Sequence, residues 1–133
     1  MEDLFATGQI ILIDKPLTWT SFDAVKKLKS NLKIKKIGHA GTLDPLATGL
    51  LIICTGKFTK KIESIQNSEK EYVCRMFLGK STPSYDLETE FNQELPIAHI
   101  TEQTIHDVVQ KFMGEILQTP PAHSAVKIDG KRA

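Results

Sequence analysis

The run Leu50-Leu51-Ile52-Ile53-Cys54 (LLIIC) is the longest uninterrupted apolar stretch in the chain of 133 residues, and it decides the fold. A short, continuous, β-branched run that ends at Thr55-Gly56 predicts a strand buried on both faces. Five apolar residues fall far short of the roughly 20 that cross a bilayer, and no basic, apolar leader opens the sequence. We therefore expect neither a membrane span nor a secretory signal.

Elements of both kinds precede and follow this strand. Gln9 to Ile13 predicts a strand that stops before Pro16. Thr20 is predicted to cap a helix with an apolar face and a basic face, which lasts until about Asn31 or Leu32. Further along, we expect a short helix around Phe58 to Ile65, a strand from Glu71 to Leu78 and the longest loop at 80–96.

The last third of the chain has one strong helical pattern. After the capping residue Thr101, apolar residues recur at i, i+3, i+4 and i+7: Ile105, Val108, Val109 and Phe112. Gly114 ends this helix. Short strands are expected at Glu115 to Gln118 and Ser124 to Ile128, and Asp129-Gly130 is a strong hairpin signal.

Strands and helices thus mix without a regular βαβ alternation, and the hairpin favours antiparallel pairing. The sequence predicts an α+β fold, with a mixed, mainly antiparallel sheet and flanking helices. A length of 133 residues fits one domain or a piece of a larger one. Because almost no strand is left after Asp129-Gly130, we expect the domain to be incomplete in this chain.

Composition and charge narrow the function classes. With 41% hydrophobic and 25% charged residues, the chain resembles ordinary globular proteins. Residues 1–80 hold 13 Lys/Arg against 8 Asp/Glu, a net charge of +5, whereas residues 81–133 hold 4 against 8, a net charge of −4. This asymmetry suggests a basic face for a polyanion, although scattered lysines are more often only a solvated surface.

The cysteines and histidines give no sign of a metal site. Cys54 and Cys74 lie in apolar stretches, and two cysteines make at most one disulfide, so we expect reduced core thiols in a cytoplasmic protein. The four histidines are scattered and lack the spacing of metal ligands. The sequence therefore predicts neither a metal site nor a disulfide framework.

The most unusual stretch is GHAGTLDPLATG, at 38–49. Three glycines, two threonines and a proline frame one carboxylate, Asp44, directly before the buried strand. An aspartate on a stiff loop is a sensible nucleophile or general base. From spacing alone, however, a plain Asp-Pro turn is the better interpretation, because no second carboxylate, Ser–His pair or metal cluster accompanies Asp44.

Short motifs along the chain keep a distinctive order: Ile13-Asp14-Lys15-Pro16, Thr20-Ser21, the block at 38–49, Gly56, Thr59-Lys60, Lys70-Glu71-Tyr72, Leu78-Gly79 and Ser124 to Arg132. Almost end to end, this order resembles the TruB family of pseudouridine synthases. The resemblance implies a pseudouridine synthase fold, of which residues 1–133 are the N-terminal portion of the catalytic domain. The remainder of that domain and a C-terminal RNA-binding domain would be absent from this chain.

Residue roles follow from the resemblance by position. Bacterial members of the family are isomerases that convert uridine to pseudouridine in the T loop of tRNA, at tRNA position 55. Asp44 matches the catalytic aspartate, which attacks the target nucleotide so that uracil detaches, rotates and reattaches through C5. His39 matches a histidine that contacts RNA near the flipped nucleotide, and Tyr72 a tyrosine that stacks on the target base. Lys15 and Lys127 lie in motifs near the site and are plausible structural or RNA-contacting groups.

The implied chemistry needs no cofactor and no metal, and the implied partner is the T-arm stem-loop of tRNA. We expect the complete protein to be a monomer. A stacked base must be flipped out, and the ring of Tyr72 offers it an aromatic face. The Lys/Arg excess up to residue 80 fits salt-sensitive phosphate binding. Without the motifs, Tyr72 would be read as a sheet residue and His39 as a loop histidine bonded to the backbone.

The chain departs from the family pattern in two places. After Leu78-Gly79 the family usually has Thr-Asp-Thr, Asp and Asp-Gly, whereas this chain has Thr82-Pro83-Ser84, Asp86 and Glu88-Thr89, so we expect a differently shaped loop. The family's active-site arginine and the apolar wall of its base pocket would follow Ala133.

Two readings therefore stay open: the N-terminal part of a tRNA pseudouridine synthase, inactive on its own, or a non-catalytic RNA-binding fragment. A third, a carboxylate hydrolase, would need a second acid close to Asp44, and the block at 38–49 contains none.

Overall fold

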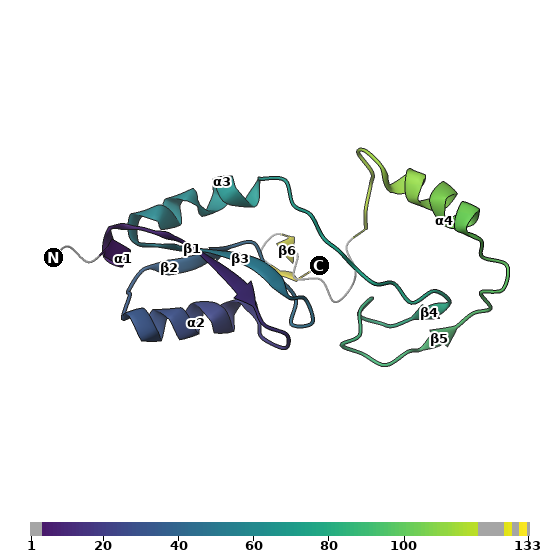
Figure 1. Cartoon of the computed structure of the whole chain (residues 1–133), viewed down its shortest axis with the longest axis horizontal. Helices are drawn as coiled ribbons and strands as arrows, with labels where there is room; N and C mark the ends of the chain where they lie inside the picture. Colours follow the sequence, from purple (N-terminus) through teal and green to yellow (C-terminus); the bar gives the residue numbers. More distant parts are fainter. Residues whose placement is uncertain (1–3, 120–126, 129–130, 133) are drawn as a thin grey trace. The chain divides into compact units, whose positions relative to one another are not determined.

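A computed structural model describes residues 4–119, 127–128 and 131–132. The chain divides into two compact units, residues 1–72 and residues 73–133 (Figure 1). Helices and antiparallel strands mix along the chain, which confirms the predicted α+β class. In the described ranges, no helix is long and apolar enough to cross a membrane.

The first unit is built on a three-stranded antiparallel sheet. Its strands are β1 (Ile10–Lys15), β2 (Ile37–Ala40) and β3 (Gly49–Thr55), with β3 in the centre. The predicted LLIIC strand is therefore the central strand, with Ile13 opposite Leu51 on one side and His39 opposite Ile53 on the other. Leu51, Ile53 and Cys54 are buried as expected, whereas Leu50 is 62% exposed near the start of the strand.

Helix α2 (Ser21–Leu32) covers one face of this sheet. Ala24 and Val25 of the helix pack with Leu51 and Ile53 of β3 to form the core. The Thr20 hydroxyl accepts a hydrogen bond from the Asp23 amide at 3.1 Å, and the Asp23 carboxylate accepts one from the Thr20 amide at 2.9 Å. This capping box confirms the predicted start of the helix, and its end at Leu32 is also as predicted.

Shorter helices complete the first unit. They are α1 (Leu4–Thr7), the 3₁₀ helix η1 (Gly56–Lys61) and α3 (Ile62–Gln66), and the last two confirm the short helix expected around 58–65. Figure 1 shows α2 and α3 on opposite sides of the sheet. Gly56 has φ 52°, and a Cβ there would lie 2.2 Å from the Ala6 carbonyl oxygen, so α1 can sit on this turn only because residue 56 is glycine.

The second unit contains short elements. Strands β4 (Lys80–Ser81) and β5 (Gln93–Glu94) pair within the segment expected to be a loop. Helix α4 (Glu102–Val109) continues into the 3₁₀ helix η2 (Gln110–Phe112), and the Thr101 hydroxyl accepts from the Thr104 amide at 3.1 Å, which confirms the predicted cap and helix.

The last described elements are two short paired strands. Strands β6 (Lys127–Ile128) and β7 (Lys131–Arg132) pair antiparallel, as the Asp129-Gly130 hairpin signal predicts. Residues 129–130 themselves, and residues 124–126 of the strand expected at Ser124 to Ile128, lie outside the described residues.

Two predicted strands are wrong. Residues 71–77 and 115–119 form no strand in the structure. A strand needs a neighbour for its backbone N–H and C=O groups, and no described segment pairs with either stretch. Val73 is 97% exposed, and Cys74 is an exposed thiol rather than the expected core thiol, whereas Cys54 is buried as expected.

Candidate functional site around Asp44

Asp44 lies in the loop at 41–48, which joins β2 to β3 as the turn of a hairpin. Gly41 and Gly49, at the two ends of the loop, have φ of 103° and 112°, a backbone conformation that residues with a side chain rarely adopt. Within the loop, the Ala47 amide donates to the Asp44 carbonyl at 3.0 Å. The Asp44 side chain is exposed. The hairpin therefore presents one carboxylate to solvent on a tight turn.

Ser21 fixes the residue before Asp44. The Ser21 hydroxyl accepts a hydrogen bond from the Leu43 amide at 2.9 Å and donates one to the Leu43 carbonyl at 3.2 Å. Ser21 is the first residue of α2 and is buried, so its hydroxyl oxygen occupies a defined place at the edge of the core. Both backbone polar groups of Leu43 are thereby tied to the start of the helix.

The residue after Asp44 is fixed by the segment that leads from β1 to α2. The Thr18 amide donates to the Pro45 carbonyl at 2.8 Å. Thr18 has φ 71°, which is a strained conformation for a β-branched residue. Such strain persists only where the surroundings hold it, and here it aims the Thr18 N–H at Pro45.

The Lys15 ammonium group also donates to the Pro45 carbonyl. Lys15 is the last residue of β1, its side chain is fully buried, and its ammonium group donates to the carbonyls of Pro16, Trp19 and Pro45. An ammonium group has three N–H donors, so all three are used by main-chain oxygens. The structure thus assigns Lys15 a structural task, which is to join the end of β1 to both loops around Asp44.

His39 lies at the base of the Asp44 loop. It is half-buried in β2, and its Nδ1 is 2.5 Å from the Gly41 carbonyl oxygen. A carbonyl can only accept, so Nδ1 carries a proton, and in a neutral ring Nε2 is then an acceptor. The resemblance predicted a contact between His39 and RNA, and the geometry leaves Nε2 as the ring atom that could make it.

The site residues expected from the sequence are not all brought together. Tyr72 ends the first unit outside any strand with 69% of its surface exposed, and in the described part of the chain no ring contact or hydrogen bond joins it to Asp44 or His39. Lys127 begins β6 in the second unit. The Asp44 carboxylate has no hydrogen bond or ion pair to any described residue.

Sequence reasoning quoted Ser21 in the motif Thr20-Ser21 without giving it a role, and it missed Thr18. Ser21 follows a recognised cap residue, and a hydroxyl at the first position of a helix is free to bond elsewhere because Thr20 already caps the helix. That position is the local signal that could have predicted a bond from the Ser21 hydroxyl to another segment. Its partner Leu43 is 22 residues away, so the contact itself has no signature in sequence.

The helix cap next to Ser21 contains a carboxylate with a lowered pKa. Hydrogen bonds from the Thr20 hydroxyl and amide lower the pKa of Asp23, so its carboxylate is ionised and completes the cap next to Ser21.

Among the described residues, no group of three or more His, Cys, Asp and Glu side chains could hold a metal ion.

Comparisons with known proteins identify the family. The model of the TruB family pseudouridylate synthase (N terminal domain) matches residues 29–133. The chain is 58% identical over 135 residues to the tRNA pseudouridine synthase B of Flavobacterium johnsoniae. This alignment covers 96% of this chain and 59% of that protein. It is 52% identical over 135 residues to the tRNA pseudouridine synthase B of Parabacteroides distasonis, with 97% and 57% covered.

A solved structure matches over nearly the same length. A crystal structure of a Cbf5-Nop10-Gar1 complex superposes with a TM-score of 0.60 and 28% identity over 92% of this chain and 32% of that chain. The chain thus spans less than three fifths of the length of these two curated relatives. Because the family model covers most of the sequence, this chain belongs to the TruB family of pseudouridylate synthases.

Proposed function

We propose that this chain is the N-terminal portion of the catalytic domain of a tRNA pseudouridine synthase that isomerises uridine 55 in the T loop, with Asp44 as the nucleophile. The observation that carries the proposal is the exposed Asp44 carboxylate on a turn whose two neighbours, Leu43 and Pro45, are both held by buried or strained groups. A nucleophile held in one geometry avoids the entropic cost of finding it during the reaction.

The proposed reaction rearranges atoms within one nucleotide. Asp44 attacks the target nucleotide, the bond between N1 and C1′ breaks, and uracil rotates. A bond then forms between C5 and C1′, the bond between the Asp44 carboxylate and the nucleotide breaks, the C5 proton leaves and N1 takes up a proton, so product and substrate have the same composition and Asp44 is free again. The step needs no redox partner, which agrees with the expectation that no cofactor takes part.

His39 and Tyr72 are proposed to hold the flipped nucleotide. The Nε2 atom of a neutral His39 can accept a hydrogen bond from a ribose hydroxyl near Asp44, because Nδ1 is already bonded to Gly41. The exposed ring of Tyr72 can supply the stacking surface that a flipped base loses. Lys127 is proposed as an RNA contact in the same protein, and Lys15 as a group that positions the loop.

The alternative, a non-catalytic RNA-binding fragment, is favoured by one observation. The Asp44 carboxylate has no cationic partner among the described residues and faces solvent. A carboxylate nucleophile needs a positive partner to orient it and a wall that excludes water. We propose that the chain of 133 residues alone binds RNA without modifying it, and that the complete protein is a cytoplasmic monomer.

A chimera tests the catalytic proposal. Residues 1–133 replace the matching segment of the Flavobacterium johnsoniae relative, and pseudouridine in a T-arm RNA is read by carbodiimide-based primer extension. We expect conversion at uridine 55 by the chimera, none by the isolated chain, and none by the chimera carrying Asp44→Asn, which keeps its RNA affinity.

Tyr72 variants of the chimera test the stacking role. Tyr72→Phe should act almost normally, whereas Tyr72→Ala should lose on the order of 1–3 kcal/mol of substrate binding.

Near wild-type turnover by the Asp44→Asn chimera would end the nucleophile assignment. Stoichiometric conversion by the isolated chain would show that the site in residues 1–133 is sufficient. An equal loss of substrate binding in both Tyr72 variants would show that the hydroxyl of Tyr72, and not the face of its ring, is the important group.

A further inference from the structure

The two peptide planes that meet at the Cα atom of Asp44 are both held by hydrogen bonds. The plane between Leu43 and Asp44 is held through the Leu43 carbonyl, which accepts from the Ser21 hydroxyl at 3.2 Å. The plane between Asp44 and Pro45 is held through the Asp44 carbonyl, which accepts from the Ala47 amide at 3.0 Å. Because peptide units are planar, fixing both planes fixes the direction of the Cα–Cβ bond. Two hydrogen bonds therefore set the direction in which the carboxylate leaves the turn.

Of these two bonds, the one from Ser21 reaches outside the loop. Ala47 belongs to the loop at 41–48, so its amide moves with Asp44 whenever the whole loop moves. Ser21 is the first residue of α2 and is 2% exposed at the edge of the core. The Ser21 hydroxyl thus connects the direction of the carboxylate to the packed part of the fold.

The turn is held by more groups after the carboxylate than before it. After the carboxylate, the Pro45 carbonyl accepts from two donors, the Thr18 amide at 2.8 Å and the Lys15 ammonium at 3.4 Å. Before it, Ser21 is the one residue in the described ranges whose side chain bonds to the backbone of Leu43. Loss of one donor leaves the Pro45 carbonyl with another, whereas loss of the Ser21 hydroxyl frees both backbone groups of Leu43.

The bonds to Leu43 require a hydroxyl at position 21. A hydroxyl has one O–H donor and two acceptor lone pairs, so the Ser21 oxygen can accept from the Leu43 amide and donate to the Leu43 carbonyl. Thr20 already caps α2, which leaves the Ser21 hydroxyl available for these bonds. With alanine at position 21, packing against the core still keeps the Leu43 side chain in place, but its two peptide planes can rotate.

We propose that Ser21 is a positioning residue for Asp44, whose carboxylate it holds in the direction from which the nucleotide is attacked. The inference rests on the proposed function, because the reaction it serves is the one assigned to Asp44. Ser21 acts through the backbone of Leu43 and not on the reacting atoms. Its effect should therefore appear in the rate of the chemical step and not in RNA affinity, since a misplacement of about 1 Å can slow a reaction about 100-fold.

Three hydroxyl deletions in the chimera test this assignment. Ser21→Ala removes the proposed positioning group. Thr20→Ala removes the adjacent capping hydroxyl and leaves the bonds between Ser21 and Leu43 in place. Thr55→Val removes a fully buried hydroxyl that also accepts from a backbone amide, that of Gln9 at 3.0 Å.

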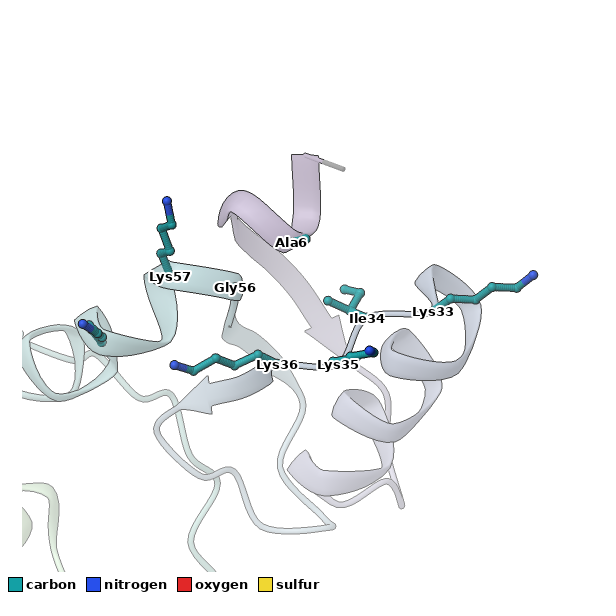
Figure 2. A pocket seen from close by; sticks show the side chains of 8 residues that line it. Ala6, Lys33, Ile34, Lys35, Lys36, Gly56 and Lys57 are labelled. Carbon is teal, nitrogen blue, oxygen red and sulfur yellow. The ribbon is translucent and has the colours of Figure 1, made fainter. Parts of the chain in front are cut away.

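Thr55 is a matched control because it lies far from Asp44. It is the last residue of β3, whose 7 residues span about 20 Å from the Asp44 loop. Figure 2 shows that end of the strand, where the Gly56 amide donates to the Lys36 carbonyl at 2.9 Å. Thr55→Val therefore reports what a lost buried hydrogen bond does to the enzyme when the Asp44 loop is untouched.

The expected result is a split between kcat and KM. Ser21→Ala should lower kcat by about 10–100-fold and change KM for a T-arm RNA by less than about threefold. Thr20→Ala and Thr55→Val should keep kcat within about twofold of wild type. Carbodiimide-based primer extension at timed intervals measures the rates, and thermal melting followed by circular dichroism compares the stabilities of the three variants.

Three kinetic outcomes would overturn the assignment. An unchanged kcat in Ser21→Ala would show that the carboxylate is positioned without Ser21. An equal loss of kcat in Thr55→Val would show a general effect of lower stability. A raised KM with an unchanged kcat would make Ser21 a group for RNA binding.

Hydrogen exchange in the 133-residue chain measures the same geometry without activity. In Ser21→Ala the Leu43 and Ala47 amides should exchange at least about tenfold faster, while the Gln9 amide keeps its rate. In Thr55→Val the Gln9 amide should exchange faster and the other two should not. Unchanged exchange at Ala47 in Ser21→Ala would show that the turn keeps its shape without the hydroxyl, which would also overturn the proposal.

The positioning role and the catalytic proposal fail in different ways. A wild-type chimera that forms no pseudouridine would end the role of Asp44, and with it that of Ser21. An active wild-type chimera in which Ser21→Ala is as fast as Thr20→Ala would end the role of Ser21 alone.

Discussion

The two units of this chain use apolar side chains in opposite ways. In the first, Leu51 and Ile53 of the central strand are buried against α2, and Lys15 is buried with them. Across described residues 73–119, Thr82 is buried but no hydrophobic side chain is, and Phe77 meets Phe91 only in an edge contact. The sheet makes the difference, because β3 has a partner on each side, whereas β4 and β5 pair over two residues. Burial thus follows strand pairing more closely than it follows hydrophobicity.

Matched isoleucine substitutions should separate the units most strongly. Ile53→Ala removes a fully buried side chain and should cost about 2–5 kcal/mol of unfolding free energy, whereas Ile116→Ala, at a half-exposed position, should cost less than about 1 kcal/mol. Urea unfolding followed by circular dichroism measures both. Equal costs would mean that Ile116 is buried in solution and would break the comparison.

A pair of lysine substitutions carries the comparison to charged groups. Lys15→Met removes the ammonium donor from the Pro16 and Trp19 carbonyls and leaves the Pro45 carbonyl with the Thr18 amide alone, so it should cost about 2–3 kcal/mol. Lys80→Met removes an exposed ion pair with Glu94 and a cation–π contact with the Phe91 ring, and should cost at most about 1 kcal/mol. Hydrogen exchange adds a local readout, since the Leu43 amide should exchange faster in Lys15→Met alone. Unchanged exchange at Leu43 would show that Lys15 does not support the Asp44 loop.

The two cysteines report on the units without any substitution. Burial raises the pKa of the Cys54 thiol, with Lys61 opposing the shift, so it stays protonated and covered, while Cys74 is exposed. Cys74 should react with a thiol reagent at least about tenfold faster than Cys54 at pH 8. Mass spectrometry of peptides after timed labelling assigns each rate. Similar rates would indicate that β3 opens readily or that the segment around Cys74 is covered.

The helix caps give the smallest effect and a pH dependence. Thr20→Ala should cost about 1 kcal/mol at pH 7, and so should Thr101→Ala. The pKa of Asp23 is lower in the folded state than its unfolded value of 3.8. The contribution of its carboxylate to the free energy of unfolding is therefore fully present above pH 3.8 and is lost as the pH falls through the lowered pKa. The cost of Thr20→Ala should therefore shrink in acid, whereas that of Thr101→Ala, whose cap bonds to Thr104 without a carboxylate, should not. Parallel pH profiles of the two variants would contradict this.

Local signals explain what sequence reasoning found. The capping box at Thr20, the amphipathic pattern after Thr101 and the apolar run at 50–54 each depend on neighbours within a few residues, and each element is where it was predicted. The glycine-framed acid Asp44 is also visible in sequence, and the structure puts it on an exposed turn. Local evidence alone favoured a plain Asp-Pro turn, and only the resemblance to the family predicted a catalytic role.

Elements that depend on distant partners were missed or wrong. Strand β2 contains Gly38 and His39 and lacks apolar alternation; it is a strand because β3 lies beside it. The stretch 71–78 has a strand-like composition and no described partner. The hydrogen bonds between Ser21 and Leu43 likewise join residues far apart in sequence, which composition cannot reveal.

The hydrogen bonds of the buried Lys15 ammonium group also determine where this fold tolerates an insertion or a deletion. One Pro45 carbonyl oxygen receives both the Lys15 ammonium and the Thr18 amide, while Ser21 holds Leu43 two positions earlier. Inserting or deleting one residue at 16–19 would shift these donors relative to Pro45 as surely as a change at 42–44 would. Length changes should therefore be as harmful between Lys15 and Ser21 as beside the carboxylate itself, whereas the exposed stretch at 87–91 should accept them.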